Sequence, residues 1–226
     1  MFNIEQFPPP LIQPACVLCE AKTHNTLGIC QDCWQDLPWQ AQNCCSQCGL
    51  PATDHVCGHC ISEPPFFDAT QALFEYTYPI DALLQAYKYQ HTLHLARLFA
   101  AISLKQRMSN EVDCILPMPM HPARLQQRGF NQSLELAKRI AKLLHKPLAT
   151  QHCQRIKNTP PQASLPLKAR VKNIKNAFAC DDYFAGKHVA IVDDVMTSGA
   201  SLNELAKTLK AAGAAKVTCW VVARTY

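Results

Sequence analysis

The 226-residue chain has no long hydrophobic run, and none of its apolar stretches approaches the length that spans a bilayer. Residues 1–10 contain no Lys or Arg, so they lack the basic start of a secretory signal peptide. The sequence also has no internal repeat and no low-complexity tract. These absences argue against membrane insertion, and we expect a cytoplasmic protein with a sizeable core.

Positive charge is nearly missing from the first part of the chain. Residues 1–64 contain Lys22 as their one Lys or Arg against six acidic residues, and they hold nine of the thirteen cysteines. Residues 65–226 carry 21 basic and 11 acidic residues. This change in charge and cysteine content, near Ser62-Glu63-Pro64-Pro65, predicts two domains, 1–64 and 65–226.

The N-terminal cysteines form four Cys-x-x-Cys pairs. They are Cys16 and Cys19, Cys30 and Cys33, Cys45 and Cys48, and Cys57 and Cys60. Two such turns supply the four thiolates of a closed, structural zinc site. Because disulfides are disfavoured in the cytoplasm, the clustering points to metal, and we predict a zinc ribbon with two zinc ions bound by neighbouring pairs.

Other arrangements of these thiols fit the same spacing. They are one zinc ion with the remaining thiols free, interleaved pairing of the turns, and disulfide bonds. Cys44, beside Cys45, is a spare thiol that would be able to exchange into a site. In each zinc arrangement so short a segment lacks a core of its own and would fold around its metal.

A strand, an acidic pair and a small-residue loop follow one another late in the chain. Val189–Val192 has the pattern of a strand buried on both faces, and Asp193 and Asp194 follow it. Thr197–Ser201 then leads into a helical apolar pattern over 202–209. Loop and helix-start N–H groups attract phosphate, and carboxylates accept hydrogen bonds from sugar hydroxyls, so this stretch predicts a sugar-phosphate site.

Residues 189–201 resemble the fingerprint of type I phosphoribosyltransferases, in which four apolar residues, two acids and two apolar residues precede a Thr-Thr-Gly-x-Thr loop with Ser allowed. The resemblance implies an α/β domain with a parallel sheet that binds phosphoribosyl pyrophosphate (PRPP) with Mg²⁺. It implies that Asp193 and Asp194 hold the ribose hydroxyls and stabilise a cationic sugar if the protein is catalytic. The ribose and 5′-phosphate would also contact Val195, Met196, Thr197, Ser198, Gly199, Ala200 and Ser201. The alternative is an ordinary strand–loop–helix unit whose acids lie at the crest of a parallel sheet, with or without a bound Mg²⁺ ion.

A second buried strand, 112–116, precedes a segment with two arginines. Ligands of parallel α/β sheets bind beyond the carboxyl ends of the strands, so the loop after this strand should open beside Asp193. Arg124 and Arg128, four residues apart near a helix start, suit a diphosphate. Their alternative role is a surface basic patch.

The segment Arg124-x-x-x-Arg128-Gly-Phe-Asn-Gln resembles a signature of the ComF/GntX family. These competence-associated proteins combine a phosphoribosyltransferase-like domain with an N-terminal cysteine-rich ribbon, so the resemblance spans nearly the whole chain. It implies that the pyrophosphate binds at the loop after the second strand, at Pro119, Met120, His121, Arg124 and Arg128.

Residues 121–175 contain twelve Lys or Arg residues against Glu135 alone. This excess is greater than one PRPP requires and predicts a phosphate-rich partner, with single-stranded DNA the leading candidate. The candidate contacts are Arg124, Arg128, Lys138, Arg139 and Lys142, with Tyr87, Tyr89 and Phe130 as candidate stacking residues. Lys88 either reaches an anion or stays solvated, and the loop 158–164 either closes over a ligand or merely connects.

The combined prediction is a zinc ribbon followed by a phosphoribosyltransferase-like α/β domain, with structural zinc and with Mg²⁺ arriving with PRPP. The family resemblance implies a role in DNA uptake and natural transformation, through PRPP and single-stranded DNA, and a competence protein as a partner. The alternative is an active transferase that moves phosphoribosyl from PRPP to an unidentified acceptor. No residue pattern names a general base or an acceptor pocket.

Overall fold

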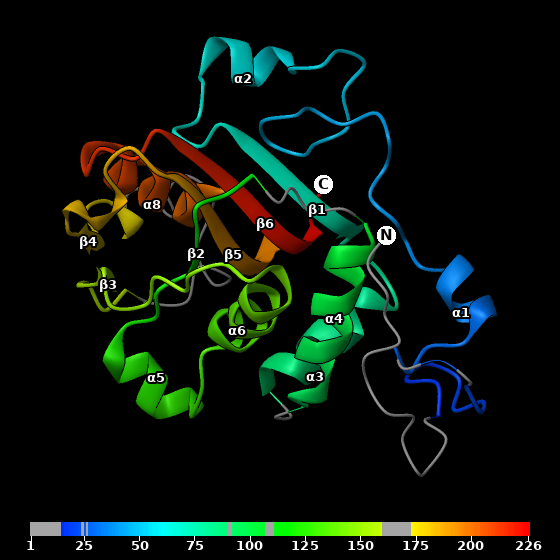
Figure 1. The fold of residues 1–226 in the computed structure, drawn as a ribbon. Coiled ribbons are helices and arrows are strands. Elements are labelled where there is room, and N and C mark those ends of the chain that lie inside the picture. Colours follow the sequence, from blue (N-terminus) through cyan, green and yellow to red (C-terminus); the bar gives the residue numbers. More distant parts are fainter. Residues whose placement is uncertain (1–14, 24, 26, 90–91, 107–110, 160–172) are drawn as a thin grey trace.

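The computed structural model describes residues 15–23, 25, 27–89, 92–106, 111–159 and 173–226. At its centre lies a four-stranded parallel sheet in the order β1-β6-β5-β2 (Figure 1). The strands are β1 (Ala69–Glu75), β2 (Cys114–Pro117), β5 (His188–Met196) and β6 (Lys216–Arg224). The α/β architecture with a parallel sheet is confirmed.

Helices cover both faces of this sheet. On one face lie α3 (Ile80–Tyr89), α4 (His94–Lys105) and α6 (Gln132–Leu144), and on the other lies α8 (Ala200–Ala211). Side chains alternate across a strand, and β5 follows this rule. Ala190 and Val192 lie in the core beneath α6, whereas Val189 and Ile191 lie in the core beneath α8. A continuous apolar run is therefore buried on both sides, as in other parallel sheets.

The buried face of α6 follows from the position at which the helix starts. Leu136 and Ile140 are buried, whereas Leu134 and Leu144 are only partly buried. Asn131 sets the helix start, because its side chain accepts hydrogen bonds from the first free backbone N–H groups. The buried stripe follows from that start at the usual spacing of four residues.

Two short elements have no periodic apolar pattern in the sequence. One is α5 (Pro122–Arg128), a single short helix with Pro at its first position and Gly129 in the left-handed conformation after its end. The other is a two-stranded antiparallel hairpin, β3 (Cys153–Arg155) with β4 (Phe178–Cys180), followed by the 3₁₀ turn η3 (Asp182–Phe184). Three-residue strands are too short to show an alternating pattern.

The cysteine-rich part, with α1 (Gln31–Gln35) and α2 (Gly58–Ser62), lies along β1, the edge strand of the sheet (Figure 1). Its backbone bonds directly to that strand: Gln40 N donates to Leu73 O at 2.9 Å, and Thr70 N donates to Ser46 O at 3.0 Å. The ribbon thus covers a sheet edge that would otherwise expose unpaired backbone groups. No helix among the described residues is long and apolar enough to cross a membrane.

Candidate functional site

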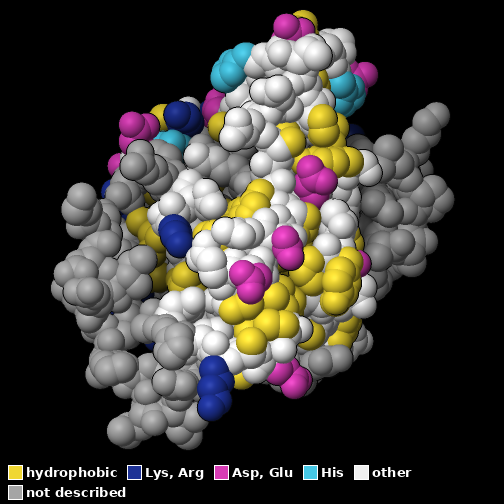
Figure 2. Space-filling model, turned by 90° about the vertical axis from the view of Figure 1, so that its right-hand side faces the viewer, with side chains coloured by type: hydrophobic (Ala, Val, Ile, Leu, Met, Phe, Trp, Pro, Cys, Tyr) yellow, Lys and Arg dark blue, Asp and Glu magenta, His cyan; other side chains and the backbone are white. Residues whose placement is uncertain are grey.

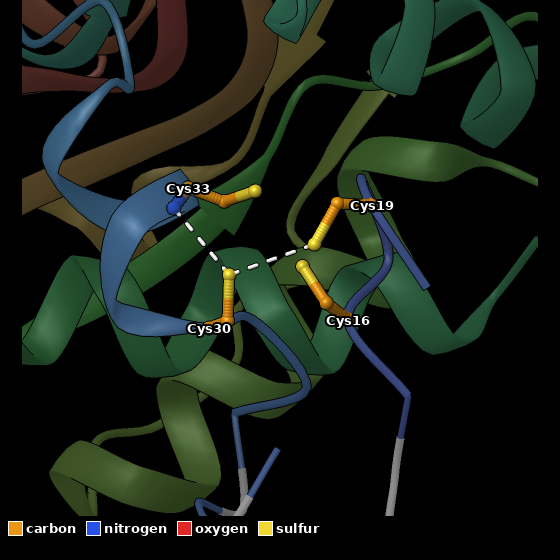
Figure 3. A group of neighbouring side chains, drawn as sticks. All are labelled: Cys16, Cys19, Cys30 and Cys33. Carbon is orange, nitrogen blue, oxygen red and sulfur yellow. Dashed lines mark hydrogen bonds between the residues drawn. The ribbon is translucent and has the colours of Figure 1, made fainter. Parts of the chain in front are cut away.

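The eight predicted metal ligands form two separate groups. Within each group the four thiol sulfurs lie within 4.8 Å of one another. The groups are Cys16, Cys19, Cys30 and Cys33, and Cys45, Cys48, Cys57 and Cys60. Figure 3 shows the first four side chains converging on one point, with the Cys19 and Cys30 sulfurs 3.6 Å apart. The pairing of neighbouring turns is confirmed, interleaved pairing is wrong, and each Cys₄ group fits a closed structural zinc site.

The first cysteine of each group lies in a ring of backbone N–H donors. Burial raises the pKa of Cys16, but hydrogen bonds from backbone N–H groups outweigh it and hold that pKa at about 6. The same balance holds the pKa of Cys45 at about 6. Because zinc binds the thiolate, each group of four cysteines carries one ligand that favours the ionised form at neutral pH.

A cavity of about 540 Å³ opens beyond the carboxyl ends of the parallel strands. β2 and β5 are neighbours, and Met118 N donates to Val192 O at 2.8 Å, so the loops that follow these strands meet. The lining residues include Asp193, Asp194, Val195 and Met196 at the end of β5, Thr197, Gly199, Ala200 and Ser201 after it, Pro119, Met120, Arg124 and Arg128 after β2, Gln85, Lys88 and Tyr89 on α3, and Arg155 on β3.

The two acids are each held by a protein donor. Asp193 accepts a hydrogen bond from Ser133 Oγ at 2.8 Å. Asp194, 4% exposed, pairs with Lys88 Nζ at 2.6 Å. Burial would lower the pKa of Lys88, but Asp194 outweighs it and raises that pKa. Lys88 is therefore an internal ion-pair partner and not a solvated lysine.

Asp193 is the carboxyl group whose charge is least favourable. Burial, and then the negative charge of Asp194, raise the pKa of Asp193 to about 7. The hydrogen bond from Ser133 favours the carboxylate but does not cancel these effects. A group with this pKa changes its protonation near neutral pH, which is unusual for an aspartate.

The loop after the acids is shaped by Gly199, which has φ +75° directly before α8. Residues with a Cβ rarely adopt this conformation, so glycine lets the loop turn into the helix. The first residues of this 12-residue helix, Ala200 and Ser201, line the cavity, and a helix start attracts anions. Ser198 is not among the cavity-lining residues, and its hydroxyl accepts a hydrogen bond from Ala200 N instead.

Three arginines converge on the cavity from two elements. Burial and the neighbouring Arg128 lower the pKa of Arg124, and burial and Arg124 lower the pKa of Arg155. The charge of Arg128 thus acts on Arg124 and that of Arg124 on Arg155, and the three cations form a positive wall of the cavity, which suits a polyanion. Sequence reasoning missed Arg155, because the short strand that carries it has no detectable pattern.

Several residues predicted to contact pyrophosphate or DNA do not line the cavity. His121 is absent from the cavity lining, because its Nδ1 accepts a hydrogen bond from Ala123 N and caps α5. Lys138 pairs with Glu135 on the surface of α6, and neither it nor Arg139 and Lys142 lines the cavity. Of the basic residues in the midsection, Lys168, Arg170 and Lys172 lie outside the described residues, as does most of the loop 158–164.

Of the three candidate stacking residues, one is placed to contact a ligand. Tyr87 is fully buried, and its hydroxyl donates to Gln132 O at 2.6 Å. Phe130 packs against the same core. Tyr89 is 68% exposed at the cavity, and the Arg128 guanidinium lies 5.4 Å from the centre of its ring. A planar ring beside a cation is a suitable platform for a nucleobase.

Arg224 joins the second Cys₄ group to the loop after β5. This side chain is 4% exposed, and its Nε donates to Cys48 O at 2.9 Å. Its terminal nitrogen donates to Met196 O at 2.9 Å and also to Thr197 O. One buried cation therefore bonds to carbonyls of both the metal knuckle and the cavity loop, which fixes their relative positions.

Comparisons with known proteins agree with this organisation. Residues 7–61 match the double zinc ribbon domain, and residues 131–225 match the phosphoribosyl transferase domain. The chain is 34% identical to the DNA utilization protein YhgH of Salmonella typhimurium, covering 93% of this chain and 96% of that protein. It is 29% identical to competence protein F of Haemophilus influenzae, covering 92% of this chain and 96% of that protein. Competence protein ComFC of Bacillus subtilis is 23% identical, and the match covers 93% of this chain and 95% of that protein.

Fold, Cys₄ groups and domain matches together define a phosphoribosyltransferase-type protein with an N-terminal double zinc ribbon. The relatives cover nearly the full length of both chains, including the segment between the two domain matches. The chain belongs to the ComF/GntX family.

Proposed function

We propose that this protein binds PRPP, or a related ribose phosphate, in the cavity beyond β2 and β5. The observation that carries the proposal is the convergence of an acid pair, a helix start and three arginines on one cavity. Asp193 and Asp194 would accept hydrogen bonds from the ribose hydroxyls. The loop from Val195 to Ser201 would donate its N–H groups to the 5′-phosphate.

The diphosphate would lie against the positive wall. Arg124 and Arg128 come from α5 and Arg155 from the hairpin, so they would reach it from two sides. Both acids are already engaged, by Ser133 and Lys88. We therefore assign Mg²⁺ to the diphosphate of the incoming ligand, where it would neutralise charge, and not to a protein-bound site.

We propose single-stranded DNA as a second ligand. Its phosphates would contact Arg124 and Arg128, and Tyr89 at the rim would stack on a base. The face shown in Figure 2 is not suited to DNA phosphates, because its exposed hydrophobic side chains lie among Asp and Glu residues, with few Lys or Arg. The names of the relatives, competence protein F and DNA utilization protein YhgH, support a role in DNA uptake. We propose that the protein acts in the cytoplasm, together with a competence protein.

Calorimetric titration of Mg²⁺–PRPP and of oligo(dT) into the zinc-loaded protein, separately and together, tests both ligands. We expect PRPP to bind wild type and to bind Asp193→Asn/Asp194→Asn at least about tenfold more weakly, since ribose contacts are lost. The matched control is Lys142→Gln on the exposed side of α6. Binding of PRPP that is equal in the acid variant and in wild type would overturn the PRPP assignment.

The same titrations test separately whether single-stranded DNA binds at the arginines of the cavity. We expect oligo(dT) affinity to fall as salt rises, and Arg124→Gln/Arg128→Gln to reduce both affinity and salt slope. Lys138→Gln/Lys142→Gln, away from the cavity, removes the same charge and should have the smaller effect. Salt-independent binding, or equal losses in the two variants, would contradict DNA binding at the cavity.

A second candidate function is phosphoribosyl transfer. Tyr76, Gln85 and Tyr89 also line the cavity, and an acceptor would lie against them, beside the ribose. The acceptor nucleophile would form a bond to the anomeric carbon while the bond to pyrophosphate breaks, and the arginines would stabilise the leaving group. Mg²⁺-dependent pyrophosphate release with added nucleobases, lost in Asp193→Asn/Asp194→Asn, would support this reaction.

A further inference from the structure

The hairpin of β3 and β4 places two cysteines directly opposite each other. The strands are antiparallel, and Cys153 faces Cys180. In the adjacent pair, Asp181 N donates to His152 O at 3.2 Å. Hydrogen-bonded and non-hydrogen-bonded pairs alternate along such a ladder, so the cysteines form a non-hydrogen-bonded pair, in which facing Cα atoms come closest, at about 4.5 Å.

The two thiols are already in contact, with their sulfurs 2.8 Å apart. A disulfide needs Cα atoms roughly 4.4–6.8 Å apart, a range that this kind of pair satisfies without backbone movement. The two cysteines in the main sheet are not arranged in this way. Cys114 lies in β2 and Cys219 in β6, both fully buried and separated by β5.

The cysteines of the hairpin differ in access. Cys153 is 4% exposed, and its hydrogen bond with Cys180 and its burial raise its pKa. Cys180 is only partly buried and lies at the margin of the same core. An oxidant from solvent would therefore meet Cys180 first, and the second thiol already lies beside it.

We propose that Cys153 and Cys180 form a reversible dithiol–disulfide couple whose oxidant is a low-molecular-weight disulfide of the glutathione class. The Cys180 thiolate attacks one sulfur of the oxidant, forms a mixed disulfide and releases one thiol. Cys153 then attacks the Cys180 sulfur and releases the second thiol. Two protein thiols are oxidised and one disulfide is reduced to two thiols, which take up the two protons.

The couple lies next to a residue of the cavity. Arg155 is two positions after Cys153, in the next non-hydrogen-bonded pair, and its guanidinium lies 5.8 Å from the ring centre of its partner Phe178. A disulfide two residue pairs away would fix the strand pairing that holds Arg155 against the cavity. The inference rests on the geometry of the hairpin and is independent of the ligand proposed for the cavity.

Peptide mapping of the full-length, zinc-loaded protein tests the couple. The protein is equilibrated in reduced and oxidised glutathione at several ratios, quenched with acid, alkylated and digested with trypsin without reduction. We expect one linked species of peptides 143–155 and 176–187, two hydrogens lighter than the free pair, which disappears on adding dithiothreitol. Cys44→Ser, outside both metal groups, is the control and should keep the link.

Single substitutions separate the two steps. In Cys153→Ser the reaction should stop at the mixed disulfide, so Cys180 carries one glutathione; in Cys180→Ser, Cys153 should remain mostly unmodified because it is buried. Oxidised wild type should also unfold at a higher temperature than reduced wild type, with no such difference in Cys153→Ala/Cys180→Ala. Alkylation of both cysteines at the most oxidising ratio, or links to ribbon cysteines instead, would overturn the proposal.

Discussion

Asp193 shows how one residue connects the strand, the core and the chemistry of the site. It lies in β5 directly after the apolar run 189–192, so its carboxyl group lies at the margin of a buried sheet next to a second acid. That position raises its pKa from the ordinary 3.8 to about 7. In the folded protein the group therefore keeps a proton between these two values, while the unfolded chain has released it.

This difference makes stability depend on pH. Where the folded state binds more protons than the unfolded state, the free energy of unfolding decreases as pH rises. We expect wild type to lose stability between about pH 4 and pH 7 more steeply than Asp193→Asn, by at most about 1.4 kcal/mol per pH unit. Urea unfolding of both proteins across that range measures the difference. If the free energy of unfolding changed with pH in the same way in the two proteins, Asp193 would titrate in its ordinary range.

Gly199 provides a second test at the scale of one residue. Both Gly199 and Gly186 have positive φ, +75° and +72°, but only Gly199 lies at the cavity. Alanine at either position should cost about 1–2 kcal/mol of stability, because L residues are strained there. Only Gly199→Ala should also weaken PRPP binding, which calorimetry measures against Gly186→Ala. Equal PRPP affinity in both variants would contradict a role for this loop in binding phosphate.

At the scale of elements, the ion pair between Lys88 and Asp194 joins α3 to the end of β5. Both side chains are largely buried, so Lys88→Met would leave an unpaired carboxylate in the core. We expect Lys88→Met to lower the free energy of unfolding by about 3–5 kcal/mol. The double variant Lys88→Met/Asp194→Asn, which also removes the carboxylate charge, should recover a part of this loss. Lys138→Met breaks the exposed pair with Glu135 and should cost less than about 1 kcal/mol. Urea unfolding with zinc present compares these variants, and similar losses for the two single lysine variants would contradict the structural role of Lys88.

How far the elements could be predicted depends on the length of their patterns. The strand and loop over 189–201 and the four Cys-x-x-Cys turns carry their information locally, and the structure contains both. Arg155 and the Cys153–Cys180 pair depend on a hairpin of three-residue strands, which no periodicity can show. The Lys88 pair joins residues 106 positions apart, so only the fold brings them together.

The directions of neighbouring side chains on α3 could not be predicted from the sequence either. Tyr87, Lys88 and Tyr89 are consecutive on α3, yet the first is in the core, the second reaches an acid and the third is exposed at the cavity. A helix turns by about 100° per residue, so neighbours cannot share one role. The aromatic cluster proposed for stacking therefore reduces to Tyr89.

At the scale of the whole molecule, the ribbon and the α/β domain share more than a linker. The proposed boundary near residue 64 separates them in composition, but ribbon backbone pairs with β1 and Trp39 packs on Phe74 with ring centres 4.8 Å apart. We expect the fragment 65–226 to aggregate or to unfold at a lower temperature than the full chain, since its edge strand is uncovered. Size-exclusion chromatography and thermal unfolding measure this; a monomeric fragment of unchanged stability would show that the domains are independent.

The two zinc groups should differ in their effect on the cavity. Arg224 connects only the second group to the loop at Met196 and Thr197, whereas the first group lies near α4, where Lys105 Nζ is 4.2 Å from the Trp34 ring centre. We expect Arg224→Lys to keep two zinc ions per chain but to weaken PRPP binding more than about tenfold. The control Lys105→Gln should change neither. Zinc content is measured by colorimetric assay and binding by calorimetry, and unchanged PRPP affinity in Arg224→Lys would refute the link.

The position of Arg224 in the chain has a consequence for biosynthesis. It lies 176 residues after Cys48, so a ribosome adds this guanidinium long after the ribbon cysteines. The second zinc knuckle can therefore assemble before its anchor has been made. The cavity loop, held by the same guanidinium, would reach its final shape only after residue 224 has left the ribosome, so the nascent protein would carry zinc before it is able to bind a ribose phosphate.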